Sequence, residues 1–302
     1  MQFLKSSLFI FSALLILSCK EQPKTDTQTS YNQVESVTEK TKLPAFKTNK
    51  QFNDYWYTGQ AEITSYQLEQ SRYGEIRTGT AVLVFVTEPF LKNDQVKADQ
   101  NNPSNINVLK LNATKKFNTG IYPYSIMQST FYPVANNQHA LKVSASVQEW
   151  CGHIYTQLNN REQFQVTSHS YFQGEADQNF NLEKNILENQ IWTQLRIDPN
   201  SLPVGNIKII PSLEYTRLNH KPLKAYNAFA ENKPGQYTLK IKDLDRQLTI
   251  KYNPSFPYTI QSWEETQNGN TTKATKIKTL QSDYWNKKSN SDLELRQTLG
   301  LE

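Results

Sequence analysis

Strict alternation of apolar and polar residues is the feature of this sequence that most restricts its fold. In residues 237–242, Tyr, Leu and Ile alternate with Thr, Lys and Lys, and residues 247–252 repeat the pattern after a short turn. Because successive side chains of a strand point to opposite faces, this pair predicts an antiparallel hairpin with one face in solvent. Residues 258–266 and 271–280 predict a second hairpin, joined through Asn268-Gly269, a dipeptide typical of tight turns.

Most of the remaining chain carries the same β signals. Further strands are predicted at residues 61–72, 80–88, 108–113, 125–134, 139–157 and 163–173. Near-helical spacing predicts a helix packed on the sheet over residues 182–196, and a short C-terminal helix over residues 293–301. The predicted fold class is therefore all-β or β-dominant. It would be one large curved antiparallel sheet, as a half-barrel or a barrel, with one or two packed helices.

The N-terminus has the features of an exported protein. Residues 1–18 combine a Lys, an apolar run and a small residue just before Cys19, as in a secretory signal peptide. The apolar run is too short to span a membrane. The sequence Ile-Leu-Ser-Cys at residues 16–19 resembles a bacterial lipobox, so we expect Cys19 to be acylated. The alternative is an ordinary secretory signal with a coincidental cysteine.

Acylation of Cys19 would determine where the protein acts. A lipoprotein carries at least two acyl chains, which together anchor it stably to a membrane. Residues 19–46 are rich in polar residues, so they are expected to form a flexible tether. A single β-rich domain is predicted over residues 47–302. The expected location is the cell envelope, with the outer membrane favoured, facing either the periplasm or the cell surface.

Charge and cysteine content narrow the range of partners. The chain has 33 basic and 28 acidic residues and a net charge of +5. So mild an excess, on an exported protein, argues against nucleic acid as a partner. If Cys19 is acylated, Cys151 has no cysteine left for an intramolecular disulfide, and the fold must rest on its core. The sequence contains no Gly-rich phosphate loop and no nucleophile-elbow motif, and no cofactor is expected.

The densest group of reactive side chains is Glu-Trp-Cys-Gly-His at residues 149–153. On a strand, Glu149, Cys151 and His153 would project from one face. A thiol beside an imidazole is the basis of a cysteine nucleophile, and His169 across a hairpin would add a third metal ligand. The favoured alternative is structural, with Cys151 buried as a small hydrophobic residue.

Aromatic residues are abundant, with 16 Tyr, 14 Phe and 5 Trp. Their amphipathic rings suit an apolar ligand cavity, glycan stacking or lipid headgroups. They also suit the core of a large β-sheet, where aromatic residues are favoured, and this is the preferred interpretation for most of them.

Several segments resemble an uncharacterised lipoprotein family of Bacteroidota. The resemblance is carried by residues 57–66, 72–75, 84–88, 117–124, 148–153 and 157–160, and it covers most of the chain after the tether. Some members of this family are labelled as septum formation inhibitors related to Maf nucleotide pyrophosphatases. That label implies a cytoplasmic α/β enzyme with a Ser-x-Ser-Pro-Arg-Arg motif. The motif is absent from this sequence, so the enzymatic activity is not carried over.

Three functional hypotheses follow from these features. The first is a membrane-tethered envelope protein that binds an apolar or amphipathic, lipid-like ligand in a curved sheet. The second is an envelope hydrolase or transferase that uses Cys151 and His153. The third is a structural or assembly partner of other envelope proteins, which the long tether suggests.

Overall fold

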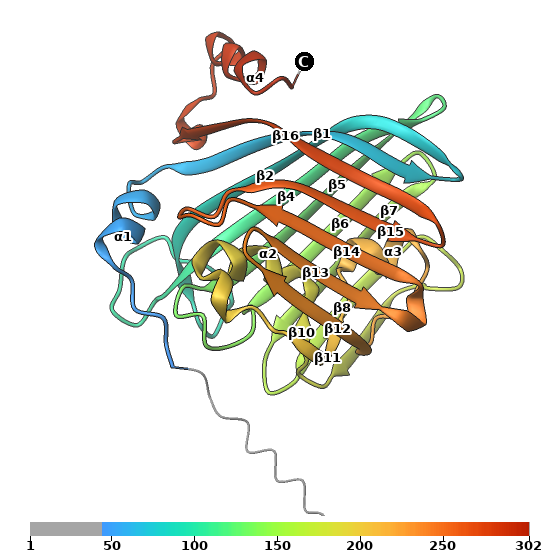
Figure 1. Ribbon diagram of the computed structural model, residues 1–302, viewed down its shortest axis with the longest axis horizontal. Helices are drawn as coiled ribbons and strands as arrows, with labels where there is room; N and C mark the ends of the chain where they lie inside the picture. Colours follow the sequence, from blue (N-terminus) through green and yellow to red (C-terminus); the bar gives the residue numbers. More distant parts are fainter. Residues whose placement is uncertain (1–43, 302) are drawn as a thin grey trace, which may run out of the picture. The chain divides into compact units, whose positions relative to one another are not determined.

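The strands of this protein build one continuous sheet (Figure 1). The computed structural model describes residues 44–301, and within them sixteen strands belong to that sheet. The first nine are β1 (Ala61–Arg72), β2 (Glu75–Leu91), β3 (Val96–Lys97), β4 (Ile106–Thr119), β5 (Tyr122–Pro133), β6 (Lys142–Glu149), β7 (Gly152–Asn160), β8 (Phe164–Ser170) and β9 (Gln178–Leu182). The others are β10 (Ile186–Leu187), β11 (Gly205–Ile210), β12 (Tyr226–Lys233), β13 (Gln236–Ile241), β14 (Arg246–Tyr252), β15 (Ile260–Gln267) and β16 (Asn270–Ser282).

The order of the strands leaves the sheet open. It runs β10-β11-β12-β13-β14-β15-β16-β1-β2-β4-β5-β6-β7-β8-β9, and the short β3 pairs with β2 outside this path. Neighbours are antiparallel except β10 and β11. The two end strands, β9 and β10, are not hydrogen-bonded to each other in the described part of the chain. The predicted curved, barrel-like antiparallel sheet is therefore confirmed in its open form.

Tight turns explain why neighbouring strands pair where the alternation predicted. The β1–β2 turn places Tyr73 and Gly74 at positive φ, and the β15–β16 turn does the same for Asn268 and Gly269. Positive φ at both central residues is the type I′ geometry, whose twist matches that of paired strands. The two predicted hairpins are confirmed as β13–β14 and β15–β16, and β1 and β2 also pair as neighbours.

The helices occupy different sides of the sheet. They are α1 (Lys50–Trp56), α2 (Glu188–Ile197), α3 (Leu213–Leu218) and α4 (Glu294–Thr298), with 3-10 turns at Pro199–Ser201, Lys242–Leu244, Tyr284–Asn286 and Asn290–Leu293. Both α2 and α3 are almost wholly buried and pack against β5, with α2 also against β4 and α3 against β6. They therefore fill much of the concave side. The C-terminal segment instead packs Leu299 and Leu301 against Ala61 and Ile63 of β1.

Two sequence predictions need correction. The helix predicted over residues 182–196 begins only at Glu188, because residues 178–182 and 186–187 pair as β9 and β10. The single strand predicted over residues 139–157 is two strands, β6 and β7, which turn at Trp150 and Cys151. The short C-terminal helix is confirmed as α4.

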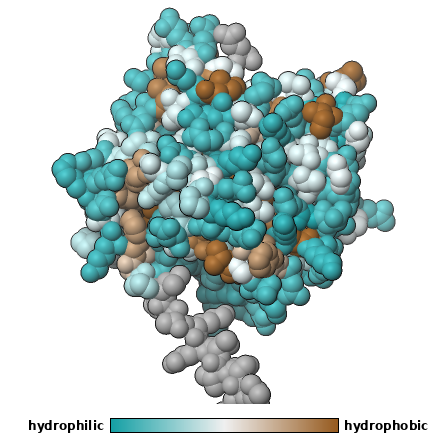
Figure 2. Space-filling view, viewed as in Figure 1, coloured by the Kyte–Doolittle hydropathy of each residue, from teal (hydrophilic) through white to brown (hydrophobic). Residues whose placement is uncertain are grey.

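The surface of the molecule is largely polar on the side drawn in Figure 2. On this side, hydrophilic residues predominate and hydrophobic side chains are scattered, as one-sided alternation predicts.

No helix in residues 44–301 is long and apolar enough to cross a membrane. The predicted signal peptide (1–18), Cys19 and nearly all of the predicted tether (19–46) lie outside the described residues.

Candidate functional site

A large hollow lies between the sheet and α3, and we call it the α3 groove. It has a volume of about 660 Å³. Its walls come from β7, β8 and β9, from the loop after β8, and from α3 with the segment that follows it. The apolar residues among them are Ile154, Val166, Phe172, Phe180, Leu213, Pro222 and Leu223. An apolar wall of this kind suits the hydrocarbon part of a ligand.

A cationic side chain is buried in this groove. Arg217 on α3 is 8% exposed, and its guanidinium carbon lies 4.1 Å from the centre of the Phe172 ring. Its Nε and Nη1 atoms have no hydrogen-bond partner among the described residues. Burial lowers the pKa of Arg217, and the charge of Glu175 only partly offsets this effect. Desolvation without hydrogen bonds is costly for a charged group, and the guanidinium retains two unused hydrogen-bond donors.

The nearest acidic group, Glu175, forms a long ion pair with Arg217, but its hydrogen bonds are with other residues. Glu175 Oε1 lies 2.7 Å from His220 Nδ1, and Glu175 Oε2 accepts a hydrogen bond of 2.6 Å from the Ser170 hydroxyl. The distance from Glu175 Oε1 to Arg217 Nη1 is 3.8 Å, beyond hydrogen-bonding range. Lys221 also lines the groove. The groove therefore combines an apolar wall with an excess of positive charge.

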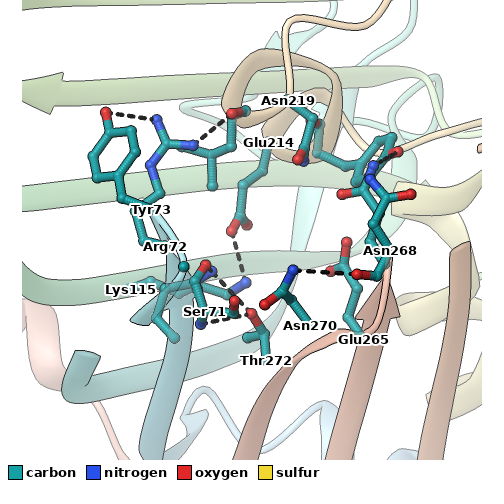
Figure 3. A pocket seen from close by; sticks show the side chains of 15 residues that line it. Ser71, Arg72, Tyr73, Lys115, Glu214, Asn219, Glu265, Asn268, Asn270 and Thr272 are labelled. Carbon is teal, nitrogen blue, oxygen red and sulfur yellow. Dashed lines mark hydrogen bonds and ion pairs between the residues drawn. The ribbon is translucent and has the colours of Figure 1, made fainter. Parts of the chain in front are cut away.

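A second hollow, which we call the rim pocket, is lined by different residues of α3 (Figure 3). Its volume is about 180 Å³. It is lined by Gln70, Ser71, Arg72, Tyr73, Gly74, Lys115, Glu214, Tyr215, Leu218, Asn219, Glu265, Gln267, Asn268, Asn270 and Thr272. These residues come from the turn ends of the β1–β2 and β15–β16 hairpins, from β4, and from α3 and its C-terminal end.

The inner charges of the rim pocket neutralise one another. Lys115 Nζ lies 2.6 Å from Glu214 Oε1, and the two side chains point toward each other in Figure 3. Glu265 Oε1 accepts a hydrogen bond of 2.8 Å from Arg246 Nε. Burial would raise the pKa of Glu265, but the charge and hydrogen bond of Arg246 lower it overall. This hollow therefore offers hydrogen bonds around ion pairs that are already satisfied.

A smaller cavity, of about 40 Å³, shares Lys115, Glu214 and Glu265 with the rim pocket, and Trp192 and Trp263 form part of its wall. That volume is close to the roughly 30 Å³ that one water molecule occupies in the liquid. The predicted curved sheet is present, α2 and α3 are buried against it, and the α3 groove is larger than the rim pocket.

The structure does not assemble the reactive group predicted at residues 149–153 on one strand face. Glu149 ends β6, Cys151 lies in the turn, and His153 belongs to β7. Cys151 is exposed rather than buried, and its backbone N–H donates a hydrogen bond of 2.7 Å to Glu149 Oε2. The hydrogen bond and charge of Glu149 raise the pKa of the Cys151 thiol. A cysteine nucleophile needs a lowered thiol pKa, because the thiolate is the reactive form.

The predicted metal ligands are also apart. In the β7–β8 ladder, His169 lies opposite Tyr155 and not opposite His153. Its Nδ1 atom lies 3.3 Å from Asp177 Oδ1 at an exposed position. Among residues 44–301, no three His, Cys, Asp or Glu side chains gather as a metal site would require.

Sequence reasoning did not identify Arg217 or the rest of the α3 groove. Helix α3 has six residues, which is too short for a periodic pattern to stand out. The groove also joins residues 154–180 with residues 213–223, and no local signal reports that contact.

Comparisons with known proteins found structural similarity without detectable sequence relatives. No protein-family model matches the sequence, and no curated protein matches it. The chain is similar to a beta-barrel-like protein from Brucella abortus that represents a domain of unknown function, DUF1849. The similarity covers 74% of this chain and 98% of that chain, with a TM-score of 0.44 and 6% sequence identity.

Proposed function

We propose that this protein binds an amphipathic anion, such as a fatty acid or another acyl lipid with a negative headgroup, in the α3 groove. Arg217 would receive the anionic group, and the apolar wall would hold the hydrocarbon chain. The observation that carries the proposal is the burial of Arg217 without hydrogen-bond partners for two of its nitrogens. The predicted lipid anchor on Cys19 would keep this activity at a membrane of the cell envelope.

Physical chemistry favours an anion with a chain over a simple ion. A hydrogen bond to a charged group contributes roughly 1.5–3 kcal/mol, and each buried methylene adds roughly 0.8 kcal/mol. Both contributions are available in the α3 groove, because Arg217 lies against the Phe172 ring and beside apolar residues of β7 and β8. A small inorganic anion would gain only the hydrogen bonds to Arg217, because it has no methylene groups to bury.

The test compares two probes that share one hydrocarbon chain, one with a charged headgroup and the other with a neutral one. The full chain with Cys19→Ala, which lacks the predicted acylation site, is titrated with the fluorescent fatty acid cis-parinaric acid and with its methyl ester. We expect Arg217→Gln to weaken binding of the acid at least tenfold and to leave binding of the ester unchanged. Lys240→Gln, which removes a charge from an exposed outer position of β13, is the matched control. Equal affinities of all three proteins for the acid would contradict the proposal.

The rim pocket supports a second candidate function, the binding of a small uncharged molecule rich in hydroxyl groups. Two buried atoms there, Gln70 Oε1 and Arg72 Nε, have no hydrogen-bond partner among the described residues. One is an acceptor and the other a donor, and a hydroxyl group satisfies both kinds. Calorimetric titration with neutral monosaccharides tests this candidate. Heat that disappears in Gln70→Ala supports it, and the absence of heat with the unmodified chain excludes it.

A further inference from the structure

Four hairpin turns at one end of the sheet expose a large apolar side chain each. The exposed fractions are 62% for Tyr73, 85% for Ile121, 68% for Trp150 and 65% for Tyr171. Tyr73 lies in the β1–β2 turn, Ile121 in the β4–β5 turn, Trp150 in the β6–β7 turn, and Tyr171 follows β8. We call these four residues the hairpin rim.

The sheet order explains why these turns lie side by side. One part of the sheet has the strand order β1, β2, β4, β5, β6, β7, β8, β9. Each of these strands runs antiparallel to the next. Every second connection therefore falls at the same end of the sheet. In Figure 1, α1 precedes the start of β1 at the opposite end. Twelve residues of β1 separate the two ends, which is roughly 40 Å at the usual rise per residue.

Ring contacts connect the turns to one another. Tyr73 Oη lies 3.0 Å from Tyr124 Oη, and the ring centres of Tyr122 and Trp150 are 6.3 Å apart. The ring centres of Tyr122 and Tyr124 are 5.9 Å apart, which joins the two pairs. The hairpin rim is thus backed by neighbouring aromatic rings over three turns.

The α3 groove begins next to the hairpin rim, at the residue that follows Tyr171. The Tyr171 ring lies directly over Gly152, where an added Cβ would be 2.7 Å from Tyr171 Cγ. The next residue, Phe172, lines the α3 groove, and its ring centre lies 5.2 Å from that of His220. The hairpin rim is therefore continuous with the wall of the groove.

We infer that the hairpin rim is a membrane-contact surface, through which an amphipathic ligand enters the α3 groove from the lipid. The inference rests on the proposed function for the identity of the ligand, while the membrane contact itself does not depend on it. Trp and Tyr are the side chains that favour the water–lipid interface, since they combine an apolar ring with a polar group. Ile121 at the apex of a hairpin supplies an apolar side chain for the acyl region.

The charges near the turns favour a neutral lipid surface. Arg77 Nη2 lies 2.5 Å from Glu75 Oε2, so this pair cancels, and Arg72, whose guanidinium carbon lies 4.3 Å from the centre of the Tyr73 ring, adds one positive charge. Glu149 precedes Trp150, and Asp177 accompanies His169 near Tyr171. Without an excess of positive charge, contact depends on apolar insertion and is insensitive to salt.

The experiment places the full-length, unmodified chain in phosphatidylcholine vesicles that contain brominated lipid, a short-range quencher of Trp fluorescence. Trp150 is the most exposed Trp of the described residues, Trp56 and Trp263 are buried and Trp192 is half-buried, so the signal that Trp150→Phe removes reports contact of the hairpin rim with lipid. We expect quenching that is unchanged in 1 M NaCl and falls at least twofold in Trp150→Phe. Trp285→Phe, which changes another partly exposed Trp, should retain the quenching.

Two further variants separate this inference from the proposed function. Ile121→Asn should reduce the quenching of Trp150, and Val204→Asn, which changes an exposed apolar residue elsewhere, should not. Arg217→Gln should lose affinity for cis-parinaric acid while its quenching stays the same. Equal quenching in Trp150→Phe and the unmodified chain, or no quenching at all, would overturn the membrane contact. A rim that contacts another protein would produce the second of these results.

Discussion

The carboxylate of Glu62 and the guanidinium of Arg196 face each other in the core through two hydrogen bonds of 2.6 Å. Glu62 belongs to β1 and Arg196 to α2, and their side chains are 0% and 1% exposed. Arg196 also donates from Nε to the backbone oxygen of Pro257 at 2.9 Å, and its guanidinium carbon lies 4.6 Å from the centre of the Phe85 ring. This ion pair fixes α2 on the concave side of the sheet.

Removal of either partner of this pair should destabilise the protein strongly. Glu62→Gln or Arg196→Met leaves an uncompensated or poorly bonded group in the core, at a cost of about 3–5 kcal/mol. The double variant Glu62→Leu/Arg196→Met removes both charges, so its loss should be well below the sum of the single losses. Urea denaturation followed by circular dichroism measures the three values, and additive losses would contradict the interpretation.

Acid should destabilise the protein through its buried carboxylates. Burial would raise the pKa of Glu62, but the charge and hydrogen bonds of Arg196 lower it below its usual value near 4.5. A carboxyl group whose pKa is lower in the folded state stabilises the fold above its unfolded pKa. That contribution is lost as the pH falls below about 4.5 and through the folded pKa.

Glu265 should also make the fold less stable in acid, because Arg246 lowers the pKa of Glu265 in spite of its burial. We therefore expect the melting temperature to be nearly constant from pH 7 to 5 and to fall steeply below pH 4.5. In Glu62→Gln the drop between pH 5 and 3 should be smaller, since one of the linked groups is gone. A melting temperature that does not change between pH 5 and 3 would exclude this linkage.

Gly152 should not tolerate a side chain. A Cβ there would lie 2.7 Å from Tyr171 Cγ, so Gly152→Ala must displace the Tyr171 ring. We expect a loss of about 1–3 kcal/mol, as for other overpacked positions. Gly174→Ala is the matched control, because nothing lies within 4 Å of the added carbon. Thermal unfolding of both variants tests the prediction, and equal stabilities would show that Tyr171 moves freely.

The Cys151 thiol should react slowly in spite of its exposure. The thiolate is the reactive form, and the neighbouring Glu149 raises the pKa of this thiol. Glu149→Gln removes the negative charge and lowers the pKa, so alkylation by iodoacetamide at pH 7 should become several-fold faster. The rates are measured in a Cys19→Ala background. A fast reaction that does not change in Glu149→Gln would return Cys151 to consideration as a nucleophile.

Local pairing made much of the sheet predictable from the sequence. The β13–β14 and β15–β16 hairpins connect strands that are adjacent in the chain, so alternation and turn residues report them directly. The β6–β7 turn was missed because the apolar pattern continues across a two-residue turn at Trp150 and Cys151. The start of α2 was misplaced because Leu182 and Ile186 suit a helical period but belong to strands.

The candidate site was out of reach for a different reason. Arg217 and Phe172 are 45 positions apart in the sequence and meet only after α3 packs inside the sheet. The acylation of Cys19 stays a prediction, since this residue lies outside the described part of the chain.

The ladder between β1 and β16, in which Ala61 lies opposite Ser282, has a consequence for assembly. It joins two arms, β1 to β9 and β10 to β16, within which most strands pair with a neighbour in the chain. A cut between β9 and β10, in residues 183–185, would leave each arm with its own local ladders. The intact protein therefore resembles an intramolecular complex of two fragments, whose effective concentration is set by this three-residue connection.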